Sequence, residues 1–339
     1  MRIRLFRTRV WLLVLLAAAL SGAMIMSSKM NAADELESSS LRTTSTKAMN
    51  DGNFQSAYAG FQKLVLDSQT DSMQVGNDLH QAINCLIRLG RASEFDELIA
   101  SALNVHADNW RFLRSASQSY RSIDHAGFIV AGEFQRGNHR GGGKYANAFE
   151  RDRVRSLQLL DQARKVAGDE PADELGQLLF EYSFAIQSGL GSLNSWRLQI
   201  LTDLASLPDL DENYWQGYRN EGAPVDGDGN PVLHRIPLTF EAASSDGERW
   251  RWLLAEVERL QPARRAELLT LYSNFLYNQF GVQTMAQFQW MRNGLQQDDE
   301  RDESGTFALH TLADDETIAR LATGVRRLKL PKEHHFIAL

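Results

Sequence analysis

A glycine-rich, basic stretch between residues 133 and 160 offers the most obvious opportunity for chemistry in this sequence. It reads EFQRGNHRGGGKYANAFERDRVRSLQLL, and Gly143-Lys144 could end a phosphate-binding loop. That loop needs a glycine five residues before Gly143, where Asn138 stands. It also needs a serine or threonine after Lys144, where Tyr145 stands, whose hydroxyl does not have the right reach. The next helix is expected near Phe149, too late for its N-terminus to face a phosphate. We therefore predict a glycine-rich surface loop and no bound nucleotide.

Basic residues gather in the same stretch although the protein as a whole is acidic. One interpretation is a docking site for a partner or an anion. We favour the other interpretation, in which these residues form ion pairs within the chain with Glu150 and Asp152. The candidate docking residues are Arg136, Arg140, Lys144, Arg151 and Arg155, and Arg153 lies among them.

Two other patterns resemble metal sites. The string DGDGN at Asp226–Asn230 resembles the start of a calcium loop, but Pro231 and Pro237 occupy the positions where an EF-hand needs glycine and glutamate. A turn is favoured, with weak calcium binding as the alternative. Adjacent histidines, as at His334 and His335, point apart on a helix or strand and rarely share one metal ion. We predict no metal and no cofactor.

The sequence contains none of the common catalytic motifs of hydrolases and metalloproteases. Its one cysteine, Cys85, lies among apolar residues, where a buried structural thiol is expected and a reactive one is the alternative. We therefore predict that the chain is not an enzyme.

Helical periodicity predicts the elements that must position these residues. Apolar residues recur at three- and four-residue spacing in several segments, and Gly or Asn separates neighbouring segments. The segments are NFQSAYAGFQKLVLD, NDLHQAINCLIRLG, EFDELIASAL, NWRFLRSASQSY, FERDRVRSLQLLDQARKVAG, DELGQLLFEYSFAIQSG, NSWRLQILTDLASL, SSDGERWRWLLAEVERL, RRAELLTLYSNFLYNQFG and DDETIARLATG. For the eighth segment we expect Asp246 to be the N-cap.

These segments predict an all-α fold, a helical-hairpin array resembling a tetratricopeptide solenoid with one long irregular insertion. Gly52, Phe54, Ala57 and Phe61 fit the second half of such a repeat, and a looser match begins 38 residues later at Gly90. An irregular helical array is the alternative. The expected boundaries are a linker at 24–46, the array at 47–207, a long loop with a possible hairpin at 208–247, and a continuing helical region at 248–339.

The first 23 residues read as a secretory signal peptide. Four arginines precede the apolar stretch VWLLVLLAAAL, and the small residues Ser21–Ala23 follow it. We favour cleavage, which predicts an exported protein of the periplasm or cell envelope; an uncleaved anchor, the one expected membrane contact, is the alternative. Cleavage leaves 32 basic and 43 acidic residues, a formal charge of −11. An acidic body of this kind argues against binding nucleic acid, because phosphate contacts need clustered Lys and Arg.

Several strings resemble the N-terminal region of large exported bacterial proteins of the alpha-2-macroglobulin type. They are HAGFIVAGEFQRGNHRGGG with ERDRVRSLQLL, GAPVDGDGNPVLHRIPLTFEAASSDGERWRWLL, NQFGVQTMAQF and ALHTLADDETIARLATGVRRLKLP, and together the resemblance covers residues 45–339. It implies a helical, repeat-containing segment that precedes macroglobulin domains. The β-sandwich domains of that family are not found in this sequence. Its thioester sequence is missing as well, because Cys85 is followed by LIRLG and not by the glutamine that a thioester needs. We therefore expect a fragment of a longer chain.

The expected function is a non-catalytic interaction or scaffold module in a protein of the protease-inhibitor type. Its partner would be another protein or the macroglobulin domains downstream. A free-standing envelope scaffold is one alternative. An all-helical cell-wall hydrolase with a carboxylic acid of raised pKa is the other.

Overall fold

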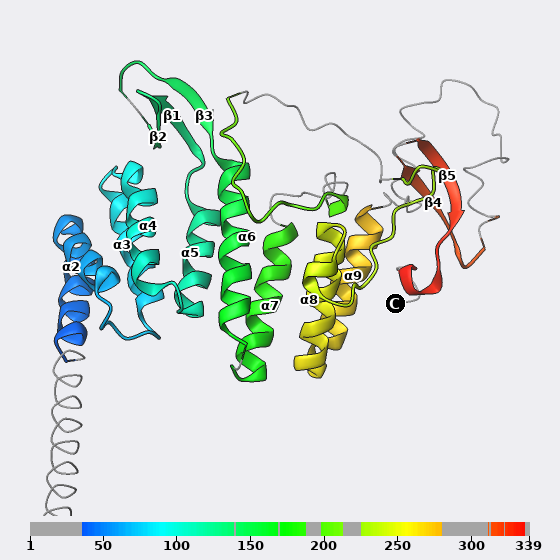
Figure 1. Cartoon of the computed structure of the whole chain (residues 1–339), viewed down its shortest axis with the longest axis horizontal. Helices are drawn as coiled ribbons and strands as arrows, with labels where there is room; N and C mark the ends of the chain where they lie inside the picture. The colour runs from blue at the N-terminus through cyan, green and yellow to red at the C-terminus, as the bar shows by residue number, and fades with distance from the viewer. Residues whose placement is uncertain are drawn as a thin grey trace, which may run out of the picture. The chain divides into compact units, whose positions relative to one another are not determined.

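The computed structural model describes residues 36–138, 140–168, 170–187, 198–212, 225–279, 311, 313–321 and 323–335 (Figure 1). They belong to two compact units, which divide after Tyr145. The predicted signal peptide, residues 1–23, lies outside the described residues. In the part that is described, no helix combines the length and apolar character needed to cross a membrane.

Unit 1 is built from helices that pack beside one another (Figure 1). A helix at residues 36–50 is followed by α2 (Phe54–Leu66), α3 (Val75–Arg88), the short 3-10 helix η1 (Ala92–Glu94), α4 (Phe95–His106) and α5 (Trp110–Ser122). Helix α3 packs against both α2 and α5, and its inward residues Val75, Leu79 and Leu86 are almost fully buried. Most residues of the predicted apolar faces therefore lie in the core, although Ile87, near the end of α3, is exposed.

Small residues bring neighbouring helices of unit 1 into close contact. A Cβ atom placed on Gly60 of α2 would lie 1.9 Å from Oγ of Ser45 in helix 36–50. On α3, a Cβ at Gly76 would lie 2.3 Å from Oγ of Ser115 in α5. Any larger side chain at either glycine would force the helices apart or displace the serine.

Three short strands follow these helices. Strands β1 (Ala126–Val130) and β2 (Glu133–Arg136) are antiparallel, and β3 (Lys144–Asn147), which reaches the unit boundary, pairs with the other side of β1. Ala131 and Gly132 connect β1 to β2 with φ angles of 52° and 88°, as a two-residue hairpin turn requires. The prediction of a surface loop is therefore wrong for residues 133–136 and 144–147, which are strands β2 and β3.

Unit 2 contains the helices α6 (Phe149–Val166), α7 (Ala172–Gln187), α8 (Asp246–Leu260) and α9 (Arg265–Gln279), with 3-10 helices η3 (Phe240–Ala242) and η4 (Pro262–Arg264). Helix α7 packs against both α6 and α8, and α8 packs against α9 (Figure 1). The chain continues in an antiparallel hairpin of β4 (Glu316–Leu321) and β5 (Gly324–Lys329), and the 3-10 helix η6 (Lys332–His334) follows it.

Four boundaries differ from those predicted. Residues 36–46, expected to be linker, are helical and pack on α2 through Ser45. Residues 200–207, expected to be helical, are neither helix nor strand. The predicted helix DDETIARLATG is strand β4, since Gly324, at a φ angle of 116°, starts an opposing strand. The N-cap of α8 is Ser245, whose hydroxyl accepts a hydrogen bond from Glu248 N, and Asp246 is the first helical residue.

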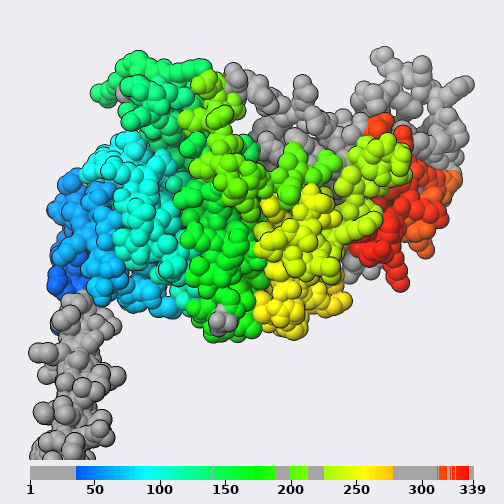
Figure 2. Space-filling model, viewed as in Figure 1, coloured from blue at the N-terminus to red at the C-terminus, as the bar shows by residue number. Residues whose placement is uncertain are grey.

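Both units are therefore mainly helical, as predicted, with a small antiparallel sheet added to the first and a hairpin to the second. In the space-filling view the helices of unit 1, blue to cyan, pack as one continuous body (Figure 2).

Candidate functional site

The predicted docking residues are divided between the two units. Arg136, Arg140 and Lys144 belong to unit 1, and Arg151 and Arg155 belong to unit 2.

Arg136 is only 4% exposed, and its guanidinium donates to the Asp96 carboxylate at 3.1 Å and to the Asp124 carbonyl at 2.9 Å. It also lies over the ring of Phe95. Arg136 therefore ties β2 to α4 inside unit 1. This is the favoured ion pairing within the chain, although the partner is Asp96 and not Glu150 or Asp152.

The other four candidates are more accessible. Arg140 and Lys144 are exposed, and so is Arg151, which donates to the Pro208 carbonyl at 3.4 Å. Arg155 is half-buried and donates to Gln158 at 3.0 Å. The expected pairing with Glu150 is made by Arg153, at 3.7 Å.

The loop before Lys144 joins two strands and does not open a helix. Strand β3 begins at Lys144 itself, and α6 begins at Phe149. This confirms the predicted mismatch to a phosphate-binding loop, which needs a helix directly after the lysine.

The Asp226–Asn230 segment is a self-contained turn. The Asp226 carboxylate accepts hydrogen bonds from Asn230 N at 2.8 Å and Asp228 N at 3.0 Å, and these bonds lower its pKa, with Asn230 N contributing most. Val225 and Pro231 pair across it. The predicted turn is confirmed, and the carboxylate that a calcium ion would need already binds its own backbone.

No group of three or more His, Cys, Asp or Glu side chains suited to a metal ion occurs in the described ranges. Cys85 is buried, and burial raises the pKa of its thiol, as expected for a structural cysteine.

A buried charge network centres on Asp246, which is 1% exposed at the start of α8. Its carboxylate accepts from Arg153 of α6 at 3.3 Å, from Arg249 at 3.1 Å, and from both the backbone N–H and the hydroxyl of Thr202. Asp246 N donates to the Ile200 carbonyl at 2.9 Å. The network thus fixes the irregular 200–207 segment to two helices.

A second polar cluster lies where η6 meets α8 and α9. We call His234, Arg251, Tyr272 and His334 the histidine cluster. The Tyr272 hydroxyl and His334 Nδ1 are 2.5 Å apart, and the guanidinium of Arg251 lies 3.5 Å from the centre of the Tyr272 ring. The ring of His234 packs on Gly247, where an added Cβ would come within 2.3 Å of it, and it also faces Phe275 of α9.

Burial controls the ionisation of this cluster. It lowers the pKa of His234 to about 4 and also lowers that of His334, and the positive charge of Arg251 acts in the same direction on both. It raises the pKa of Tyr272 to about 12. Tyr272 therefore keeps its proton and donates to a neutral His334.

Sequence reasoning missed both clusters. The histidines are scattered in the sequence, and Arg153 and Asp246 are 93 residues apart. A polar residue on an otherwise inward helix face, such as Arg153 four residues before Leu157, was the one available signal.

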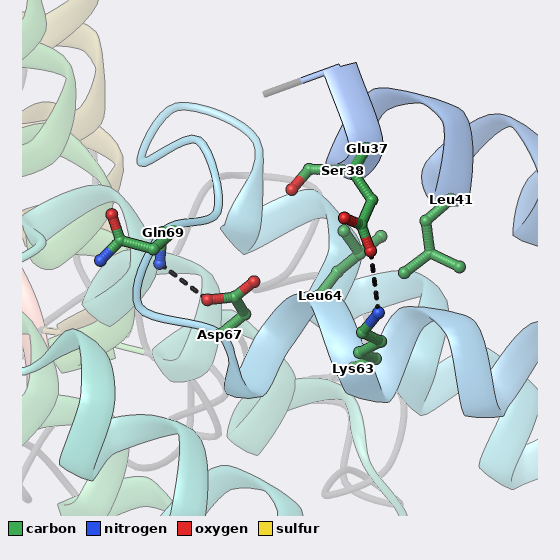
Figure 3. A pocket seen from close by; sticks show the side chains of 7 residues that line it. All are labelled: Glu37, Ser38, Leu41, Lys63, Leu64, Asp67 and Gln69. Carbon is green, nitrogen blue, oxygen red and sulfur yellow. Dashed lines mark hydrogen bonds and ion pairs between the residues drawn. The ribbon is translucent and has the colours of Figure 1, made fainter. Parts of the chain in front are cut away.

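A shallow cavity of about 150 Å³ lies between helix 36–50 and α2 (Figure 3). Lys63 and Glu37 form an ion pair across it at 3.2 Å, and Asp67 accepts from Gln69 N at 2.9 Å. Small-molecule sites usually have volumes of about 300–1,000 Å³, so this cavity is too small for most metabolites.

Comparisons with protein-family models, with curated proteins and with solved structures find no match to this chain. Functional arguments therefore depend on the residues themselves.

Proposed function

We propose that the chain is an exported, non-catalytic helical interaction module, which forms the leading part of an envelope protein of the alpha-2-macroglobulin type. The observation that carries the proposal is the close helix packing in unit 1. Stacked helix pairs that bury one another's faces leave a continuous outer surface for a protein partner.

The tetratricopeptide-like part of the proposal draws on two glycines in matching places. Gly52 and Gly90 have φ angles of 80° and 69°, and each lies in the turn before the second helix of a pair. At Gly60 and Gly76 the neighbouring helices approach through small residues. The position of the repeat's aromatic residue is taken by Phe61 in the first pair and by Ile99 in the looser second pair, and both side chains are fully buried.

Export and the link to macroglobulin domains are supported by the sequence. A basic and apolar leader precedes the helices, and the resemblance to macroglobulin-type proteins extends through both units. For the alternative of a cell-wall hydrolase, a carboxyl group of raised pKa is the needed feature. Within the described ranges, the carboxyl groups with shifted pKa are all shifted downward, namely Asp203, Asp226, Glu241, Glu267 and Glu316.

Export can be tested with a reporter that folds only outside the cytoplasm. We expect alkaline phosphatase activity when residues 1–46 are fused to the reporter, and none when residues 24–46 are fused. Mass spectrometry of the full chain should show a new N-terminus close to Ala23. Activity from the shorter fusion, or none from the longer one, would remove export from the proposal.

Partner binding can be tested with macroglobulin-type domains encoded after Leu339 or beside this gene. We expect residues 24–339 to bind such domains in surface plasmon resonance. Absence of such domains, or absence of binding, would favour a free-standing scaffold.

A charge reversal tests whether the exposed basic loop takes part in that binding. We expect Arg140→Glu to weaken it at least about tenfold at low salt, since close charge pairs at interfaces contribute about 1.5 kcal/mol or more. Arg88→Glu is the matched control, because Arg88 is also exposed in unit 1 and lies away from the loop, on α3. Equal effects of the two variants would exclude the loop as a docking site.

A further inference from the structure

The hairpin β4–β5 and η6 contact the helices of unit 2 through side chains that can change charge. We call residues 313–335 the C-terminal hairpin segment. Its two strands pair along their length, and Leu330 N donates to the Asp315 carbonyl at 3.2 Å, so the segment holds together by its own hydrogen bonds. The 3-10 helix η6 at its C-terminal end carries the buried His334, and His334 contacts Tyr272 of α9.

A second irregular segment joins the same contact. His234 lies between the Asp226–Asn230 turn and η3, and it is 4% exposed. An added Cβ on Gly229 of that turn would lie 3.5 Å from Arg326 of β5. The turn therefore touches the hairpin, while His234 packs on α8 and α9.

Protonation is unfavourable at both buried histidines. His234 Nε2 is buried and has no hydrogen-bond partner in the described part of the chain. His334 Nδ1 already receives the hydrogen of Tyr272, so a proton there would remove this bond. Arg251, which is always charged, lies against the Tyr272 ring and repels a positive charge on either imidazole.

Among the charged groups around the cluster, some raise the pKa values of the two histidines and others lower them. From α8, Glu248 attracts a proton to His234 and Arg251 opposes it; Glu333, beside His334, attracts a proton to that ring. Tyr272 of α9 is neutral, and His335 is buried next to His334. Burial is the largest influence on both histidines and outweighs the two carboxylates.

We propose that the C-terminal hairpin segment is an acid-released latch on α8 and α9, which detaches when His234 and His334 are protonated beside Arg251. In the closed state both imidazoles are neutral and Tyr272 donates to His334. In the open state both rings are in water and carry a proton. The proton comes from solvent, and no covalent bond changes.

Proton linkage fixes the direction of the effect. The open state binds protons that the closed state does not, so the closed state loses stability as the pH falls below the ordinary histidine pKa of about 6.5. For His234 this continues down to a pH of about 4. Between these limits each pH unit lowers the ratio of closed to open molecules by about tenfold for His234 alone, and His334 adds to the loss.

Hydrogen exchange measured by mass spectrometry on the full chain, corrected for the intrinsic effect of pH, tests this latch. We expect the protection of residues 313–335 to fall at least about tenfold per pH unit between about 6.5 and 4.5, while α6 and α7, which contain no histidine, keep theirs. A flat profile for the hairpin, or its loss together with α6 and α7, would overturn the proposal.

Neutral variants provide the second test. In His334→Asn the amide oxygen can accept from Tyr272 and does not titrate, and His234→Phe keeps a ring against Gly247. We expect the double variant to lose most of the pH dependence, and the exposed control His80→Asn to keep it. An unchanged slope in the double variant would overturn the latch.

Tyr272→Phe removes the hydrogen bond and leaves both histidines in place. We expect lower protection of the hairpin at pH 7.5 and a retained slope from His234. Full protection at pH 7.5 would show that the Tyr272–His334 bond does not hold the segment.

Discussion

The two units differ in what fills the spaces between their helices. In unit 1 apolar side chains meet directly, and Phe61, Leu79 and Phe112 are fully buried. The main buried charge pair there joins Arg42 of helix 36–50 to Asp78 of α3, with two bonds of 2.8 and 2.7 Å. In unit 2, carboxylates, guanidinium groups and imidazoles from distant segments lie beneath the surface.

The difference follows from the kind of segments that each unit contains. Unit 1 joins consecutive helices by short turns, so periodic apolar faces are sufficient to align them. Unit 2 must also fix segments without secondary structure, whose backbone groups need partners when they are buried. Asp246 supplies such partners for Thr202, and His234 fills the space above Gly247. Stability in unit 2 should therefore depend on charge and pH more than stability in unit 1 does.

The largest expected effect is that of Asp246→Ala in unit 2. The substitution leaves Arg153 and Arg249 buried without their carboxylate and releases Thr202. Breaking a buried ion pair by removing one partner typically costs about 3–5 kcal/mol, so we expect a loss of about 4 kcal/mol in the unfolding free energy of unit 2, measured by urea denaturation with hydrogen exchange.

Asp246→Asn is the matched control, because the amide keeps one acceptor oxygen and removes the charge. Its loss should be clearly smaller. If Asp246→Ala lost less than about 1 kcal/mol, a value typical of exposed pairs, the network would not explain how unit 2 is held together.

The next largest effect is expected in the apolar core of unit 1. Leu79→Ala removes a fully buried side chain from α3 between α2 and α5, and Leu→Ala changes of this kind cost about 2–5 kcal/mol. We expect about 3 kcal/mol, with little dependence on pH or salt, in the same denaturation experiment. A strong salt dependence would contradict the view that apolar packing holds unit 1.

This contrast also explains which parts of the fold could be predicted. The helices of unit 1 could be predicted because Phe61, Leu79 and their neighbours repeat at helical spacing. Strand β4 could not, because Ile318 and Leu321 fit a helix as well as a strand, and pairing with β5 decided between them. The 200–207 segment was predicted as a helix because its bond to Asp246 is not visible in the sequence.

The clusters of unit 2 were beyond sequence reasoning for the same reason. The same holds in unit 1 for Arg136, whose partner Asp96 stands 40 residues earlier in the sequence. His234 and His334 are 100 residues apart in the sequence and meet through α8 and α9. Local patterns determine which face of a helix is buried, but they do not determine which distant partner meets it.

A smaller effect should follow from adding one methyl group at Gly247. Its Cβ would come within 2.3 Å of the His234 ring, which cannot move aside without leaving the space between α8 and α9. Overpacking typically costs about 1–3 kcal/mol, so we expect Gly247→Ala to destabilise unit 2 by about 2 kcal/mol. It should also weaken the acid dependence of the hairpin, because His234 would already be in water at neutral pH.

A change at Gly227 is the matched control, since a Cβ there meets nothing within 4 Å. We expect Gly227→Ala to leave the acid dependence of the hairpin unchanged. If Gly247→Ala kept the full acid dependence, His234 would not be one of the groups that titrate.

The smallest expected effects compare two helix N-caps, one in each unit. Asn109 accepts from Arg111 N and Phe112 N at the start of α5, and Ser245 accepts from Glu248 N at the start of α8. Replacing either by Ala should cost about 1 kcal/mol, because a cap acts on the first turn of its own helix whatever fills the core. Glycine at the same positions should cost only about a few tenths of a kcal/mol. If Ser245→Ala cost far more than Asn109→Ala, the excess would measure how strongly the cap also positions Asp246, and a double variant with Asp246→Ala would then show non-additive losses.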